Sequence, residues 1–184
     1  MKNVILIDAF FLDALTQEFT RHFEGAIGRK LGKLDLCHWL DCLLLDAGVQ
    51  EGENENVVAF IHGPKDEGLL YATPSNFRDE LNGKAFKDNL GEFVLSSHPV
   101  EHVPTMADMM NDSLKAIMES EELQNVLVVG DFQTYGVELC KTASEDSKSA
   151  VTLFSMFPLP TGKYKTQILG FSVMSGLGIR ADEL

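Results

Sequence analysis

The sequence predicts an α/β fold of three layers, in which helices cover both faces of a mostly parallel sheet of about five strands. Continuous runs of Val, Ile and Leu, such as Val4–Ile7 and Val126–Val129, are typical of strands buried on both faces. These runs alternate with segments of helical spacing, and that alternation is typical of a parallel sheet. With 184 residues, of which 45% are hydrophobic, residues 1–184 suit one domain. We expect Val4–Ile7 and Val126–Val129 to be adjacent inner strands.

Two helices and a second strand are expected in the first third of the chain. Apolar residues recur at helical spacing from Leu12 to Phe23, and Gly25 is the expected end of this helix. A second helix is expected over residues 34–47, with Gly48 as its C-terminal stop. The short apolar run Val57–Ile61 is followed by a Gly-Pro pair, and it therefore predicts a buried strand.

The remainder of the chain continues the alternation. Ser75 is expected to cap a short helix that carries Phe77 and Leu81. Four further elements are expected: a strand over 92–95, a helix over 104–119, a helix over 135–142 and a strand over 151–154. The last apolar segment, residues 167–174, is expected to pair with the sheet.

The bulk properties limit the function classes. The formal net charge of −13 disfavours non-specific binding to nucleic acid, which requires Lys and Arg to neutralise phosphates. The N-terminal apolar run is shorter than a secretory signal, and no apolar stretch reaches the length of a membrane span. Cys37, Cys42 and Cys140 cannot all pair with one another, and their spacing matches no metal motif. We expect a reduced, cytoplasmic protein with no membrane partner.

Aspartates follow the two strands that are expected to be neighbours. Asp8 ends the first strand, Asp131 follows the other after Gly130, and Asp108 lies on the helix between them. Ligands bind at the carboxyl ends of the strands in open α/β sheets, and carboxylates gathered there favour a cation or a proton among them. An alternative is that Asp8 and Asp131 only cap the following helices, and that Asp108 lies on a solvated helix face.

Several other chemistries lack their motifs. No strand is followed by Gly-x-Gly-x-x-Gly, and the chain has neither a Walker phosphate loop nor a Gly-x-Ser-x-Gly elbow. The sequence therefore argues against a dinucleotide-binding enzyme, a phosphate-loop NTPase and an α/β-hydrolase.

Short segments along the chain match the motifs of a known family in order and spacing. They are a strand end over residues 7–11, a helix and strand over 77–81 and 90–94, an acidic helix over 103–110, and Gly-Asp-Phe-Gln within residues 127–133. Together they resemble the PIN-like nuclease superfamily, and within it the NYN branch. The likeness spans nearly the whole chain, although each motif alone is common. Three positions depart from the family pattern, because Phe11, His102 and Gln133 stand where Asn, an acidic residue and Asp are usual.

The resemblance implies a metal-dependent ribonuclease. Asp8, Asp108 and Asp131 would then bind Mg²⁺ or Mn²⁺ and carry the hydrolysis of RNA phosphodiesters. Gln133 would orient a water or a phosphate oxygen.

Two basic residues complete this interpretation of the sequence. Arg29 and Lys30, in the most basic short stretch of the chain, would contact the RNA. RNA is therefore the partner that the resemblance implies, and a homo-oligomer stays an open alternative.

A rival interpretation is a member of the family that has lost catalysis and keeps the fold to bind a partner or a nucleotide. The loss of two family polar positions, now Phe11 and Gln133, and the acidic surface favour this rival.

Overall fold

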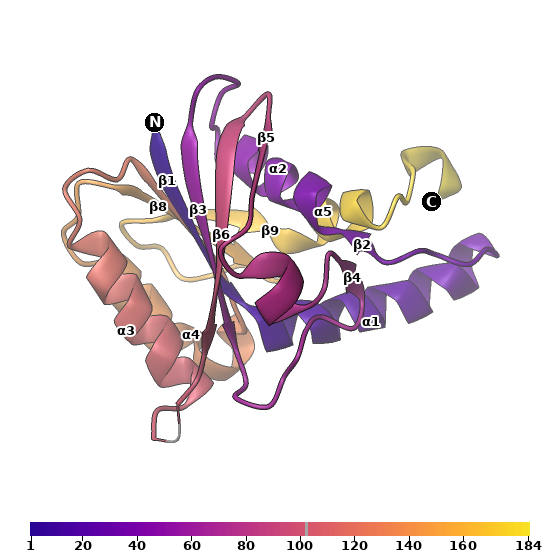
Figure 1. Ribbon diagram of the computed structural model, residues 1–184, viewed down its shortest axis with the longest axis horizontal. Helices are drawn as coiled ribbons and strands as arrows, with labels where there is room; N and C mark the ends of the chain where they lie inside the picture. Colours follow the sequence, from indigo (N-terminus) through magenta and orange to yellow (C-terminus); the bar gives the residue numbers. More distant parts are fainter. Residues whose placement is uncertain (102) are drawn as a thin grey trace.

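One sheet of seven strands forms the centre of the computed structural model, which describes residues 1–101 and 103–184 (Figure 1). Its strands are β1 (Lys2–Asp8), β3 (Glu55–His62), β5 (Ala85–Asp88), β6 (Gly91–Pro99), β7 (Asn125–Val129), β8 (Ala150–Ser155) and β9 (Lys165–Ile168). Their spatial order is β5-β6-β3-β1-β7-β8-β9, and all neighbours are parallel except β5 and β6. The expected α/β class and mostly parallel sheet are confirmed, with seven strands rather than about five.

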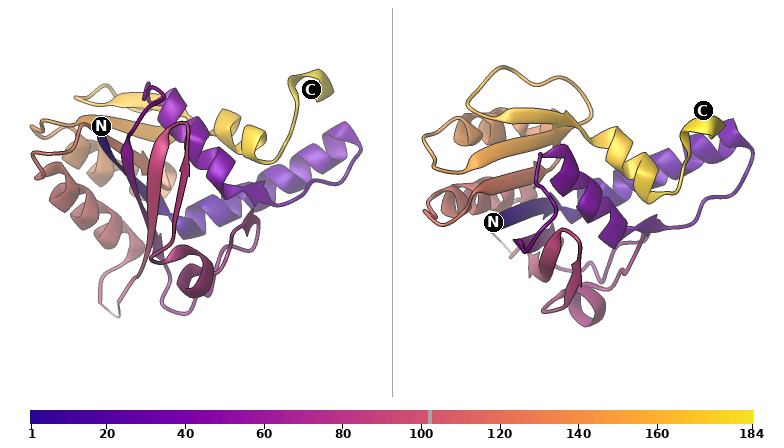
Figure 2. Two further views of the ribbon diagram at one scale, coloured as in Figure 1. Left: turned by 45° about the horizontal axis from the view of Figure 1, so that its top comes forward. Right: turned by 90° about the horizontal axis from the view of Figure 1, so that it is seen from above.

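Helices cover both faces of this sheet, which confirms the three layers. On one face lie α1 (Ala9–Ile27), α2 (Leu36–Asp46) and α5 (Leu169–Gly176), and on the other lie α3 (Met106–Met118) and α4 (Phe132–Ala143), as Figures 1 and 2 show. Each face has its own apolar core, because the strand side chains alternate: Ile5 and Ile7 face the first group of helices and Leu6 faces the second. None of the helices in the described residues is long and apolar enough to cross a membrane.

The strand order fixes where a ligand site is expected. Apart from the edge strand β5, the order read in chain sequence is 3-2-1-4-5-6, the doubly wound arrangement of α/β proteins. The order in which strands are added to the sheet reverses between β1 and β7. These two strands are parallel and in register from Asn3 opposite Asn125 to Ile7 opposite Val129. The expected adjacency of these two strands is therefore confirmed. Asp8 and Asp131 follow them at the crevice where such folds bind ligands.

The boundaries of several helices differ from expectation; α4, for example, begins at Phe132 rather than at residue 135. Helix α1 passes through Gly25 and ends at Gly28, whose φ of 71° lies in the left-handed region that glycine adopts readily. The short helical turn η1 (Phe77–Leu81) is capped by Asn76 instead of Ser75, because the Asn76 side chain accepts the Arg78 and Asp79 amides.

The last apolar segment is mostly helical. Only its first residues belong to β9, and α5 begins at Leu169. Helix α5 packs against α2, where the Trp39 indole donates a hydrogen bond to the Ser172 hydroxyl at 3.1 Å. Gly176 permits this approach, since a Cβ there would lie 2.5 Å from a methyl carbon of Leu34. A two-stranded ribbon of β2 (Leu34–Asp35) and β4 (Ala72–Thr73) and the final turn η2 (Ala181–Glu183) complete the chain.

Candidate functional site

Asp8 is held at the end of β1 with both carboxylate oxygens engaged. The side chain is only 2% exposed. Its Oδ1 accepts the Phe11 amide at 2.9 Å, which makes Asp8 the N-cap of α1. Its Oδ2 accepts the hydroxyl of Tyr135 at 2.5 Å. The carboxylate therefore serves as a helix cap and as the acceptor of a short hydrogen bond from the neighbouring strand-helix unit.

Tyr135 links the ends of β1 and β7. Its hydroxyl donates to Asp8 and accepts the Asp131 amide at 3.1 Å. The backbone of Tyr135 leaves helical geometry, with φ −131° and ψ 20°, so the first turn of α4 is distorted where the ring reaches the strand ends. Gly130 leaves room for the ring, because a Cβ there would lie 3.0 Å from the tyrosine hydroxyl oxygen. A neutral phenol thus occupies the position between the two strand ends.

Burial dominates the electrostatics of this pair. It raises the pKa of Asp8, and the charge of Asp131 raises it further, while the hydrogen bonds from Tyr135 and Phe11 lower it. Burial and the adjacent Asp8 carboxylate also raise the pKa of Tyr135. The phenol therefore keeps its proton and remains the donor in the hydrogen bond.

Asp131 is the N-cap of α4. Its Oδ1 accepts the Gln133 and Thr134 amides, both at 3.1 Å, and its Oδ2 accepts the Thr134 hydroxyl at 2.6 Å. Gln133 is exposed on the same first turn. The structure thus places Asp8, Asp131 and Gln133 at one edge of the sheet, with Asp8 and Asp131 both used as helix caps.

Asp108 is not part of this arrangement. It is exposed at the start of α3, where its Oδ2 accepts the amide and the hydroxyl of Thr105, both at 2.8 Å. The Thr105 hydroxyl accepts the Asp108 amide in return, which completes a capping box. The hydrogen bonds from Thr105 lower the pKa of Asp108. The structure thus agrees with the alternative in which Asp108 lies on a solvated helix face.

The donor set does not fit a divalent metal as it stands. Within residues 1–101 and 103–184, no three His, Cys, Asp or Glu side chains are grouped so that they could hold a metal ion. The two aspartates that do approach each other have their oxygens engaged by amide and hydroxyl donors. A metal bound through the Asp8 Oδ2 would share that oxygen with the Tyr135 hydroxyl. His102, the third departure from the family pattern, lies outside the described residues.

Arg29 and Lys30 lie far from this edge. Helix α1 has 19 residues and starts at Asp8, so these two residues beyond its other end lie roughly 28 Å away along the helix axis. Arg29 is paired with Glu183, with Nε and Oε1 2.6 Å apart, and Lys30 is paired with Glu24 at 2.9 Å. The expected contact of Arg29 and Lys30 with RNA stays a prediction, and it would lie far from the aspartates because α1 separates the two sites.

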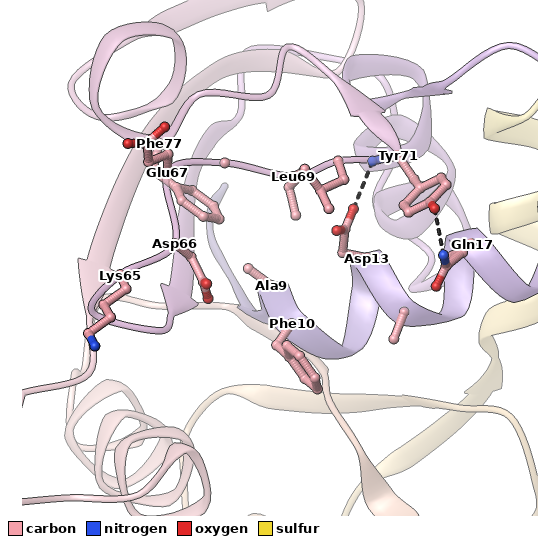
Figure 3. A pocket seen from close by; sticks show the side chains of 13 residues that line it. Ala9, Phe10, Asp13, Gln17, Lys65, Asp66, Glu67, Leu69, Tyr71 and Phe77 are labelled. Carbon is pink, nitrogen blue, oxygen red and sulfur yellow. Dashed lines mark hydrogen bonds between the residues drawn. The ribbon is translucent and has the colours of Figure 1, made fainter.

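Hollows lie beside the ends of β1 and β7. A small one of about 220 Å³ is lined by Asp131 and Gln133 together with aromatic side chains that include Phe11 and Phe157. A larger groove of about 550 Å³ lies between the start of α1 and the loop over residues 65–71 (Figure 3). Sequence reasoning missed this groove, since a loop of that length gives no periodic signal. It also missed Tyr135. If Asp131 caps a helix, a residue four positions later lies one turn on and near the same strand end, so the sequence did contain a signal for Tyr135.

Comparison with known proteins gives a family but no function. No curated protein and no solved structure matches the chain. A family model described as a family of unknown function, DUF6621, matches residues 1–184. The match covers the whole sequence, and the chain belongs to the DUF6621 family.

Proposed function

We propose that this chain is a non-catalytic, PIN-like domain that binds a partner at the carboxyl edge of its sheet. The observation that carries the proposal is the hydrogen bond from the Tyr135 hydroxyl to the buried Asp8 carboxylate. A neutral donor there does what a cation does in a metal site, since it stabilises a carboxylate that has little access to water. The strand-end aspartates then serve the fold, and the hollows beside them are left for a partner.

The metal-dependent ribonuclease stays a prediction, and one observation favours it. Asp8 and Asp131 follow adjacent parallel strands, and the Asp131 charge raises the pKa of Asp8. In that case Mg²⁺ or Mn²⁺ would be the cofactor and RNA the substrate. Asp108, Arg29 and Lys30 would have no direct part, because they are held elsewhere by Thr105, Glu183 and Glu24.

An RNA cleavage assay separates the two functions. Wild-type protein, Asp8→Asn and the exposed-site control Asp112→Asn are incubated with a mixed RNA pool and Mn²⁺, with and without EDTA. The binding proposal expects the same background for all three proteins, insensitive to EDTA. The proposal would be overturned if the wild type and Asp112→Asn cleaved RNA, EDTA stopped that cleavage, and Asp8→Asn did not cleave. Circular dichroism must show that Asp8→Asn is folded.

We also propose a reduced, cytoplasmic setting and leave self-association as a prediction. All three cysteines are free in the described part of the chain, and each is half-buried. Burial raises the pKa of Cys37 and Cys42, which keeps these thiols protonated and slow to oxidise. Sedimentation equilibrium of the purified protein tests whether it forms a homo-oligomer.

A further inference from the structure

The groove beside α1 is a preformed surface, and its assignment as a binding site rests on the proposed binding function. One wall is the first turns of α1, with Phe10, Asp13 and Gln17 on one helix face (Figure 3). The other wall is the loop over residues 65–71. Hydrogen bonds fasten this loop to the helix: the Asp13 carboxylate accepts the Tyr71 amide at 2.9 Å, and the Gln17 amide donates to the Tyr71 hydroxyl at 2.5 Å. The groove therefore keeps its width without a ligand.

The loop wall presents an open backbone edge. Gly68 pairs with Asn76 as an isolated antiparallel bridge, flanked by bonds from the Leu69 amide to Ser75 and from the Phe77 amide to Glu67. In this pattern the amide and carbonyl of Gly68 point away from Asn76. Neither Gly68 nor Leu70 makes a backbone hydrogen bond within the described residues.

Gly68 is required for this arrangement. A Cβ at that position would lie 2.5 Å from the Ser75 carbonyl oxygen, so a larger residue would push the two loop segments apart. Gly68 thus has the hydrogen-bonding pattern of an edge-strand residue at this single bridge, and the chain bends directly after it at Leu70 and Tyr71. Such edges bind extended peptides through main-chain hydrogen bonds.

Large apolar side chains stand exposed on both sides of the groove. Phe10 is 70% exposed at the start of α1, and Leu70 is 72% exposed on the loop. Phe77, which is buried and stacked on His62 with ring centroids 4.0 Å apart, forms part of the floor. Exposed apolar residues that flank one hollow are typical of a binding site for apolar side chains.

The charge of the groove is negative. Three carboxylates, those of Asp13, Asp66 and Glu67, line it together with one ammonium, that of Lys65. Asp13 and Asp66 accept backbone amides, from Tyr71 and Gly63, and Figure 3 shows the Asp66 carboxylate directed toward Ala9 and the Glu67 carboxylate directed away from it. Figure 3 shows Lys65 at one end of the groove with its amine directed away from Phe10. The net charge of −13 adds a long-range attraction for cations.

We propose that this groove binds an extended segment of a partner protein in which basic and apolar side chains alternate. The segment pairs with the amides and carbonyls of Gly68 and Leu70. Its apolar side chains contact Phe10 and Leu70, and its basic side chains reach Asp66. Alternation fits because successive side chains of a strand point to opposite sides.

Fluorescence anisotropy with labelled, capped peptides tests this proposal. The probes are a peptide of alternating Lys and Val, the same peptide with Glu in place of Lys, and the Lys-Val peptide with alternate backbone nitrogens methylated. The first should bind to the wild-type protein, more weakly as salt is raised. The other two should bind at least about tenfold more weakly, because one loses the charge match and the other loses main-chain hydrogen bonds. Failure of the Lys-Val peptide to bind, or equal binding of the methylated peptide, would overturn the proposal.

Matched variants locate the binding site. Leu70→Ala and Asp66→Asn should each weaken binding at least about fivefold. Val137→Ala and Glu138→Gln, which remove an apolar side chain and a carboxylate charge from exposed positions on α4, should leave it unchanged. In a ¹H–¹⁵N spectrum the amides of Gly68 and Leu70 should shift on titration. Equal losses in groove and control variants, or shifts confined to α3 and α4, would refute the assignment.

The two proposals fail in different ways. Absence of peptide binding together with absence of RNA cleavage removes the groove assignment and leaves the non-catalytic function standing. Metal-dependent RNA cleavage lost in Asp8→Asn removes the non-catalytic function, whatever the peptides do.

Discussion

The hydroxyl of Tyr135 compensates a carboxylate that would otherwise be costly to bury. An unpaired charged group inside a protein loses its hydration, and Asp8 is almost fully enclosed. Two donors, the Phe11 amide and the Tyr135 hydroxyl, replace that water. The same hydroxyl also accepts the Asp131 amide, so one side chain joins two strand ends.

Removal of this hydroxyl should reduce stability. We expect Tyr135→Phe to lower the free energy of unfolding by about 1–3 kcal/mol, because it leaves the buried Asp8 oxygen without its donor. Tyr164→Phe is the matched control, since the Tyr164 hydroxyl donates to the exposed Pro160 carbonyl, which water can satisfy. The control should change stability by no more than about 0.5 kcal/mol in urea unfolding. Equal losses in the two variants would contradict the role given to Tyr135.

A second pair of acids makes stability depend on pH. Asp41 on α2 lies against Asp88 on β5, and among the described residues its Oδ1 is buried without a hydrogen-bond partner. Burial, then the Asp88 carboxylate, then Asp35 raise the pKa of Asp41 from 3.8 to about 7. Cys37 and Cys42 are the other titratable groups nearby, and Asp41 contributes to their raised pKa.

The sign of the pH effect is set by the raised pKa. The folded protein keeps a proton on Asp41 that the unfolded chain releases, so this stabilisation is complete below pH 3.8 and is lost as pH rises towards about 7. We expect wild-type stability to fall between about pH 5 and about pH 8 relative to Asp88→Asn, in which the like charge is absent. Urea midpoints at the two pH values measure this difference. Asp112→Asn, exposed on α3, is the control and should follow the wild type. If Asp88→Asn also followed the wild type, the Asp88 carboxylate would not be a cause of the raised pKa of Asp41.

At the scale of elements, asparagines, of which Asn3 and Asn56 are buried, tie the three central strands together. The Asn3 amide donates to Asn56 on β3 at 2.7 Å, and the Asn125 amide of β7 donates to Asn3 at 2.8 Å. These residues are directly opposite one another in the parallel registers of β1 with β3 and with β7. The Asn56 amide continues the chain to the Leu90 carbonyl at 3.1 Å. A slip of one residue would break every one of these bonds.

This ladder predicts a coupled loss of stability. Asn3→Val should lower the free energy of unfolding by about 1–3 kcal/mol, because Asn56 and Asn125 are left with unpaired amide groups. The double variant Asn3→Val, Asn56→Val should lose less than the sum of the single variants, since both partners of one bond are then apolar. A double-mutant cycle in urea measures the coupling. Additive losses would indicate that the asparagines act independently of one another.

Helix caps explain why the candidate metal ligands could be found but not assigned from the sequence. Asp8, Asp108 and Asp131 all lie at helix starts, where Asp is favoured as a cap and also at N3 of a capping box. A metal ligand at the end of a strand and the N-cap of the following helix are both Asp at the same position in the sequence. Only the direction of each side chain separates them, and that direction is set by partners distant in sequence, as Tyr135 is for Asp8.

For the whole molecule, the predictable part of the fold is the part that is buried on both faces. The runs in β1 and β7 identify central strands, because a side chain on either face must be apolar. Strand β5 was missed, since its residues are mostly exposed and carry no apolar run. Segment 167–174 is apolar throughout and gives no period to separate a strand from a buried helix, so α5 was not recognised.

Neither the groove nor the Tyr135 contact could be predicted from the sequence, because both depend on residues that are distant in the chain. The groove exists because the loop over residues 65–71 returns to α1, through contacts to Asp13 and Gln17 that lie more than fifty residues earlier in the chain. Charge, by contrast, was readable at once: the acidic surface argued against RNA and is consistent with a basic partner.

Calorimetric titration of Mn²⁺ tests the central claim most directly, namely that the Tyr135 hydroxyl and not a cation satisfies Asp8. Wild-type protein, Asp8→Asn and Asp112→Asn are titrated at neutral pH and low salt. We expect no heat of binding that depends on Asp8, because its oxygens are engaged by Phe11 and Tyr135. Stoichiometric Mn²⁺ binding by the wild type and by Asp112→Asn that is lost in Asp8→Asn would contradict the account.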